Sequence, residues 1–143
     1  MKSCYVDTSV LVALCTNEND SSRVDKWYAN CKEELASAIW CITEFASALS
    51  IKQRTNQLTS NQATQCWERF RELCSGDINL LALEPIEYYA AANMILATNK
   101  GLKAGDALHL ACAQRHGSNS IATLDKVMAE HAKKLKIKNI FQH

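Results

Sequence analysis

Short apolar segments alternate with longer helix-like segments along the chain, and this alternation constrains the fold more than any other feature. The segments that read as strands are residues 3–6, 35–39, 78–83, 120–124 and 139–141. Strands that alternate with helices predict a parallel sheet covered by helices on both faces. We therefore expect an α/β fold, a three-layer α/β/α sandwich around a central parallel sheet.

The segments between these strands carry helix start and stop signals. The expected helices cover about residues 10–14, 21–31, 40–53, 59–76, 85–101, 106–117 and 126–135. Thr59 begins a capping-box spacing, and Pro85 stands where the first turn of a helix tolerates proline. Asp106 is expected to open its helix, while Gly101 and Gly117 are expected to close helices. Ligands of such folds bind beyond the carboxyl ends of the strands, which is where Asp7 and Asp125 fall.

Composition limits the classes of protein that this chain can represent. With 143 residues, 48% of them hydrophobic, residues 1–143 are expected to form a single domain. A formal net charge of +1 does not by itself indicate nucleic-acid binding. The lysines near the end of the chain form the nearest thing to a basic cluster, which we interpret as a solvated helix end: Lys133, Lys134, Lys136 and Lys138.

Seven cysteines are present, an odd number without any C-x-x-C pair. This pattern favours small core residues in a reducing compartment over a disulfide framework or a zinc site. No apolar run reaches the roughly 18 residues of a membrane span. A cytoplasmic protein that does not contact membranes is therefore expected.

Four carboxylates stand at element starts or strand ends within apolar sequence: Asp7, Glu44, Asp106 and Asp125. Each could be an ordinary helix cap or, for Glu44, a residue on a solvent-facing side of its helix. No lysine or arginine adjoins Asp7, Glu44 or Asp106, although Lys103 is three residues from Asp106. Because clustered carboxylates repel one another, the set favours a site for a hard divalent cation such as Mg²⁺ or Mn²⁺. Such a site can hold a phosphate and activate water.

Four segments carry a resemblance to a known family. They are YVDTSVL at residues 5–11, TEFASAL at 43–49, LKAGDALHLA at 102–111 and ATLD at 122–125. In this order and spacing the chain resembles PIN domains, and most of all the VapC-type toxins of bacterial toxin–antitoxin modules. The resemblance implies an α/β/α sandwich and a Mg²⁺- or Mn²⁺-dependent endoribonuclease that cleaves structured RNA, such as transfer or ribosomal RNA. It also implies a homodimer and a cognate antitoxin protein that covers the site.

The resemblance also assigns roles to individual residues. The metal-binding and catalytic acids would be Asp7, Glu44, Asp106 and Asp125. Ser9 and Thr123 would support the site, and Lys103 is a candidate for a contact to RNA phosphate. His109, one helical turn after Asp106, is interpreted as a packing residue.

Three other functions remain to be weighed. Val6-Asp7-Thr8 loosely resembles the start of an aspartyl-phosphate phosphatase, but that chemistry needs a second acid where Ser9 stands. A nucleotide-binding Rossmann domain is disfavoured because its glycine-rich motif is missing from the sequence. A catalytically inactive PIN-like module that binds RNA or protein is the main alternative, although loss of an acid usually marks such proteins and all four stand here.

Overall fold

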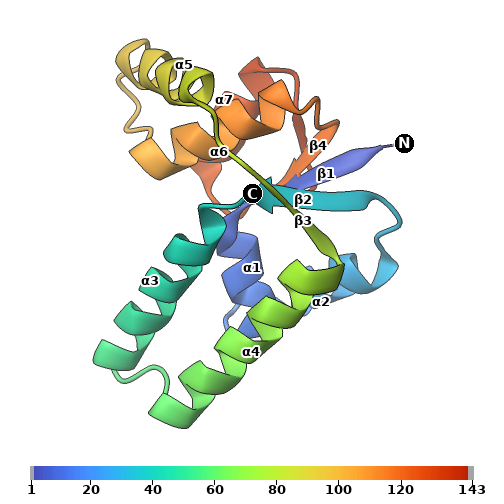
Figure 1. Cartoon of the computed structure of the whole chain (residues 1–143), viewed down its shortest axis with the longest axis vertical. Coiled ribbons are helices and arrows are strands. Elements are labelled where there is room, and N and C mark those ends of the chain that lie inside the picture. Colours follow the sequence, from blue (N-terminus) through green and yellow to red (C-terminus); the bar gives the residue numbers. More distant parts are fainter. Residues whose placement is uncertain (1, 142–143) are drawn as a thin grey trace.

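The computed structural model describes residues 2–141 and contains a five-stranded parallel sheet with the strand order β3-β2-β1-β4-β5 (Figure 1). The strands are β1 (Ser3–Val6), β2 (Glu34–Ala38), β3 (Ile78–Leu81), β4 (Ser120–Ala122) and β5 (Lys138–Asn139). The order reverses next to β1, since the chain first builds outward to β3 and then returns to add β4 and β5 on the other side. Sites in open parallel sheets form at such a reversal.

Helices cover both faces of the sheet. They are α1 (Thr8–Cys15), α2 (Ser21–Asn30), α3 (Cys41–Arg54), α4 (Ser60–Gly76), α5 (Pro85–Leu96), α6 (Ala104–Arg115) and α7 (Lys126–Lys134). Side chains of α1 to α4 form one apolar cluster with the sheet, and those of α5 to α7 form a second cluster. Figure 1 shows the two groups on opposite sides of the strands, with α3 and α4 projecting as a long hairpin. The predicted three-layer α/β/α architecture is confirmed.

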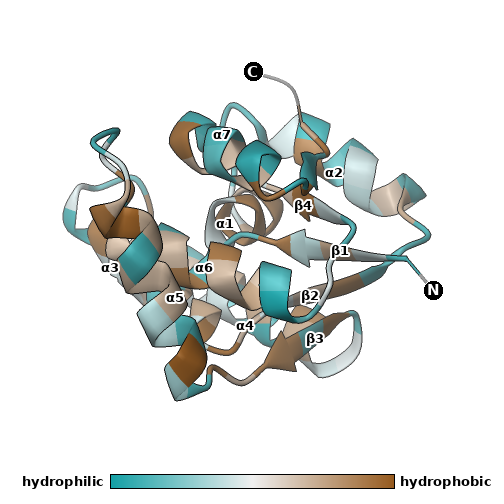
Figure 2. Cartoon of the chain, turned by 90° about the horizontal axis from the view of Figure 1, so that it is seen from above, coloured by the Kyte–Doolittle hydropathy of each residue, from teal (hydrophilic) through white to brown (hydrophobic). Residues whose placement is uncertain are grey.

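The central strand β1 supplies side chains to both layers. Cys4 and Val6 belong to the cluster under α1 to α4, and Tyr5 belongs to the cluster under α5 to α7. Successive residues of a strand point to opposite faces, so a strand buried on both faces reads as a continuous apolar run. All three side chains are buried, and Figure 2 shows that hydrophobic residues also predominate on β3 at the edge of the sheet.

Several element boundaries differ from the sequence predictions by a few residues, and two of these differences concern residues that had been assigned a role in a helix end. Helix α6 begins at Ala104 with Lys103 at its N-cap, so Asp106 lies in the first turn and does not open the helix. Helix α5 ends at Leu96, while Gly101 lies beyond it in the connecting loop with φ of 75°. A left-handed conformation is easy for glycine, and here it serves the loop before α6 and not the end of α5.

The capping signals placed other helices correctly. Thr59 accepts a hydrogen bond from the backbone of Gln62 and Gln62 caps the backbone of Thr59 in return, which is the predicted capping box. Pro85 is the first residue of α5, as expected. All seven cysteines lie within the described residues as free thiols, and five of them are buried. Within residues 2–141, every helix is too short or too polar to cross a membrane.

Candidate functional site

Four separate elements bring the predicted acids to one groove at the carboxyl edge of the sheet. Asp7 follows β1, Glu44 lies in the first turn of α3, Asp106 lies in the first turn of α6, and Asp125 precedes α7 after β4. All four line the same groove, whose volume is about 880 Å³. The structure therefore brings together the whole acidic set that the sequence analysis proposed.

Asp7 is held by hydroxyl groups and not by the backbone of the helix that it precedes. It occupies the N-cap position of α1, yet within residues 2–141 its side chain makes no capping hydrogen bond. Instead, Asp7 Oδ2 accepts hydrogen bonds from Ser9 Oγ at 2.7 Å and from Thr123 Oγ1 at 2.8 Å. The side chain of Asp7 is almost fully buried. The simple capping interpretation of Asp7 is thus wrong, and Ser9 and Thr123 lie where a supporting role requires them.

Glu44 is held by a threonine and a histidine. Thr8 Oγ1 donates a hydrogen bond to Glu44 Oε1 at 2.6 Å, and His109 Nε2 forms a second, very short contact with the same oxygen. Burial by itself would raise the pKa of Glu44, but the hydrogen bond and positive charge of His109 outweigh it and lower this pKa. Glu44 is therefore ionised at neutral pH.

His109 is the residue of the site that the sequence analysis assigned only to packing. It is completely buried, with Nδ1 2.5 Å from the Tyr5 hydroxyl and Nε2 4.0 Å from Asp7 Oδ1. Burial opposes its protonation, but the hydrogen bond to Glu44 and the charge of Asp7 outweigh burial and raise the pKa of His109. Its neighbours therefore favour the protonated form of His109 beside Glu44 and Asp7.

The spacing of the sequence contained a signal for both His109 and Tyr5. His109 is three residues after Asp106 on α6, so the two side chains share a helix face. Tyr5 is two residues before Asp7, and residues two apart point to the same side of an extended segment. Neither spacing could show that the two side chains would meet.

The pKa of Asp106 is also shifted in this groove. Burial and then the charges of Asp7 and Asp125 raise the pKa of Asp106 from 3.8 to about 6. Asp125 is both a site residue and a helix cap, since its Oδ1 accepts a hydrogen bond from the backbone N–H of Met128 at 2.9 Å. The single histidine therefore does not neutralise the carboxylates.

Two lysines border the groove beside its acids. Lys103, the predicted phosphate contact, lines it, as does Lys52, which forms an ion pair with Glu18 at 2.6 Å. The basic cluster near the end of the chain lies elsewhere. Lys133, Lys136 and Lys138 line a different pocket, formed by α7 and the segment after it.

The donor set suits a hard divalent cation. Every acid offers carboxylate oxygens, which Mg²⁺ and Mn²⁺ prefer. Within residues 2–141, no three of these acids bring ligand oxygens within 4.8 Å of one another. Mg²⁺ usually retains several water ligands and binds through one or two carboxylates, so this wider spacing fits a hydrated ion.

Solved structures with the same fold come from bacteria and an archaeon. VapC20 of Mycobacterium tuberculosis, a toxin that cleaves the sarcin–ricin loop, superposes with a TM-score of 0.73 at 12% identity, over 90% of this chain and 94% of that chain. FitAcB from Neisseria gonorrhoeae gives 0.67 at 18% identity, over 96% of each chain. PAE2754 from Pyrobaculum aerophilum gives 0.63 at 23% identity, over 98% of this chain and 90% of that chain. At these identities the likeness shows the fold.

The sequence comparisons give the family. A search of curated protein sequences finds no significant match. The model of the PIN domain family, in contrast, matches residues 4–134, which include all four acids of the groove. PIN domains are typically nucleases and generally use a divalent metal. With this match and the shared architecture, the chain belongs to the PIN-domain family.

Proposed function

We propose that this protein is a metal-dependent endoribonuclease and the toxin of a type II toxin–antitoxin module. The observation that carries the proposal is the groove in which Asp7, Glu44, Asp106 and Asp125 converge with excess negative charge. A cluster of buried and half-buried carboxylates is costly unless a cation compensates it. The PIN-domain match and the toxin VapC20 among the structural neighbours support this assignment.

The four acids would hold Mg²⁺ or Mn²⁺, which when bound supplies charge stabilisation for a phosphodiester and activation of the attacking water. The chain itself orients these acids. Ser9 and Thr123 hold the carboxylate of Asp7 through their hydroxyl groups, and Thr8 and His109 hold that of Glu44. Preorganised ligands reduce the rearrangement needed when substrate binds.

Substrate and partners follow from the same groove. Lys103 on its rim would contact an RNA phosphate. VapC20 cleaves the sarcin–ricin loop, and we extend this class of substrate to the present chain as structured RNA, either transfer or ribosomal. A cognate antitoxin would silence the enzyme by covering the groove, and the toxin itself would be a homodimer of single-domain chains in the cytoplasm.

Cleavage of purified transfer and ribosomal RNA tests the proposal. We expect cutting with Mg²⁺ or Mn²⁺, none with EDTA, and a loss of at least about 100-fold in Asp7→Asn, because this substitution removes a charged ligand at constant shape. Asp25→Asn is the matched control, since Asp25 is an exposed residue of α2, and it should cut like the unmodified protein.

Two results would contradict the proposal. Cutting that persists in Asp7→Asn would place the activity outside the acidic groove or in a contaminant. A folded protein that binds RNA and Mg²⁺ without cutting would instead support the inactive binding module considered from the sequence.

A further inference from the structure

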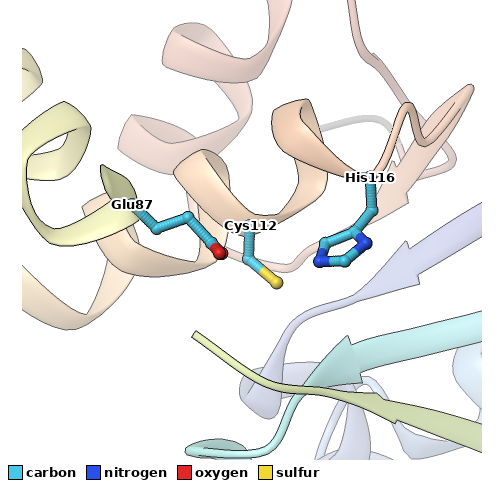
Figure 3. Close-up of side chains that lie close together, drawn as sticks. All are labelled: Glu87, Cys112 and His116. Carbon is cyan, nitrogen blue, oxygen red and sulfur yellow. The ribbon is translucent and has the colours of Figure 1, made fainter. Parts of the chain in front are cut away.

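A second group of potential ligands lies between α5 and α6. Glu87 of α5 and Cys112 and His116 of α6 bring a carboxylate oxygen, a thiol sulfur and an imidazole nitrogen within 4.8 Å of one another. Figure 3 shows the three side chains extending toward a common space between the two helices. The residues that line the acidic groove are different ones, so this group forms a separate site.

One of the two carboxylate oxygens of Glu87 is buried without a regular hydrogen bond. Its side chain is 1% exposed, and its Oε1 accepts hydrogen bonds from the backbone N–H of Glu84 at 3.0 Å and from Arg115 Nη1 at 2.7 Å. The other oxygen, Oε2, is buried and has no hydrogen-bond partner of normal geometry among the described residues, and the weakly donating thiol of Cys112 interacts with the same carboxylate. An unsatisfied buried carboxylate oxygen is costly, so a ligand at this point would be stabilising.

The two ligands on α6 are placed by helical spacing. Cys112 and His116 are four residues apart and so lie on the same helix face. Cys112 is fully buried, whereas His116 is exposed at the C-cap of α6 and leaves the cluster accessible from solvent. A thiolate, an imidazole and a carboxylate together suit a borderline-soft cation with tetrahedral geometry, and they suit Mg²⁺ poorly.

We propose that Glu87, Cys112 and His116 form a binding site for Zn²⁺ or a cation of the same class, which joins α5 to α6. Three protein ligands leave the fourth tetrahedral position to water. The charges of Glu87 and of the Cys112 thiolate balance the two positive charges of the ion, while Arg115 remains paired with Oε1 of Glu87. This site does not depend on the proposed nuclease function.

Proton release accompanies binding at this site. Burial, and then the nearby charge of Glu87, raise the pKa of Cys112 to about 12, so the free thiol is protonated at neutral pH. The metal displaces that proton, and its affinity therefore increases with pH. Because α6 also carries Asp106 and His109, an ion here would fix the same helix that supplies two residues of the acidic groove.

Titration with Co²⁺ tests the site directly. Tag-free protein is titrated with excess Mg²⁺ present, so that hard-cation positions are filled. We expect tetrahedral Co²⁺ bands together with a thiolate-to-Co²⁺ charge-transfer band, saturation at one equivalent, and loss of both signals on addition of Zn²⁺. The charge-transfer band reports a sulfur ligand, which the acidic groove does not contain.

Matched variants decide whether these residues are the ligands. Cys112→Ser should abolish the charge-transfer band, and His116→Ala should weaken Co²⁺ binding at least about tenfold. Cys74→Ser, at a half-buried cysteine of α4, should bind like the unmodified protein. Since His116 is exposed, His116→Ala gives a folded variant even if Cys112→Ser does not fold. Absence of the charge-transfer band in the unmodified protein, or full affinity in His116→Ala, would overturn the proposal.

Discussion

At the scale of single residues, the acids of the groove differ in what else they do. Hydroxyl groups orient Asp7, and a hydroxyl group together with His109 orients Glu44. Asp125, in contrast, also caps α7. Asp106 is the acid whose pKa is raised, first by burial and then by the charges of Asp7 and Asp125. These differences make the contributions of individual acids separable by substitution.

Asp125 can be divided into its two roles. Asparagine caps a helix about as well as aspartate but carries no charge, so Asp125→Asn should change the free energy of unfolding by less than about 0.5 kcal/mol. Asp125→Ala should lower it by about 1 kcal/mol, because the bond to the backbone of Met128 is lost. Urea unfolding measures both values.

The same pair of variants tests Asp125 as a metal ligand. Both should lose Mg²⁺-dependent RNA cleavage, since both remove the carboxylate. Full activity in Asp125→Asn would show that Asp125 acts as a helix cap alone.

Asp106 predicts a pH-dependent stability in the metal-free protein. Its pKa is about 6 in the folded protein against the ordinary value of 3.8, so folding favours the protonated form. The stability contributed by protonation is complete below about pH 4 and disappears as the pH rises through about 6. Asp106→Asn removes the repelled charge, and it should therefore stabilise the metal-free protein at about pH 8 and have a smaller effect at about pH 4.

Urea midpoints of both proteins at the two pH values, in EDTA, measure this difference. Comparison of the variant with the unmodified protein cancels the titration of groups that both contain. Equal effects of Asp106→Asn at the two pH values would show that neither burial nor the neighbouring acids raise the pKa of Asp106.

At the scale of elements, the site depends on close packing of α6 against the start of α3. A Cβ atom added to Gly105 would lie 2.8 Å from Trp40 Cζ2 and 2.9 Å from Glu44 Oε2. Gly105→Ala should therefore displace Glu44, lower the free energy of unfolding by about 1–3 kcal/mol through overpacking, and reduce RNA cleavage at least about tenfold. Thermal unfolding and cleavage rates measure the two effects.

Gly76→Ala is the control for Gly105→Ala. Gly76 is also helical, at the end of α4, but a Cβ atom there meets no atom within 4 Å. Activity should remain unchanged in this variant. Normal activity in Gly105→Ala would mean that α3 and α6 separate without disturbing Glu44.

The sequence predicted the elements because their signals are local. Apolar runs marked the strands, and Thr59 and Pro85 marked helix starts. The start of α6 was placed too late because Asp106 is a good capping residue, whereas Lys103 occupies the cap position. The preference of a residue type for a capping position contributes less free energy than tertiary packing. Here the packing of Gly105 close to Trp40 accompanies the earlier helix start.

The acids of the site were also predictable, since Asp7, Glu44 and Asp106 have no lysine or arginine beside them and Asp125 follows an apolar strand. The partners of these acids were not. The contact of His109 with Tyr5 joins residues 104 positions apart, and its contact with Glu44 joins residues 65 positions apart. Only the order of the strands determines that these side chains meet.

At the scale of the whole molecule, α5 exposes an apolar face. Ile86, Tyr89 and Leu96 are exposed large hydrophobic residues, and their spacing of three and seven places them along one side of the helix. We predict that this face contributes to the proposed homodimer, since a two-fold interface can pair one such patch with its copy. Leu96→Glu should then shift the protein toward the monomer in analytical ultracentrifugation.

Gln65→Glu provides the control for the added charge, because Gln65 is an exposed residue of α4. It should leave the sedimentation unchanged. An unmodified protein that sediments as a monomer would refute the homodimer, and a Leu96→Glu dimer would place the interface on another surface.

The parallel pairing of β1 with β4 has a consequence for the order of events during synthesis. Thr123 and Asp7, which are hydrogen-bonded, are separated by 116 positions, and Cys4 pairs with Ser120 in the sheet. Most of the chain must therefore be translated before Asp7 can form its hydrogen bond with Thr123. If the protein is the proposed toxin, its acidic groove would be incomplete until residues 120–125 are synthesised, so RNA cleavage by a shorter nascent chain is not expected.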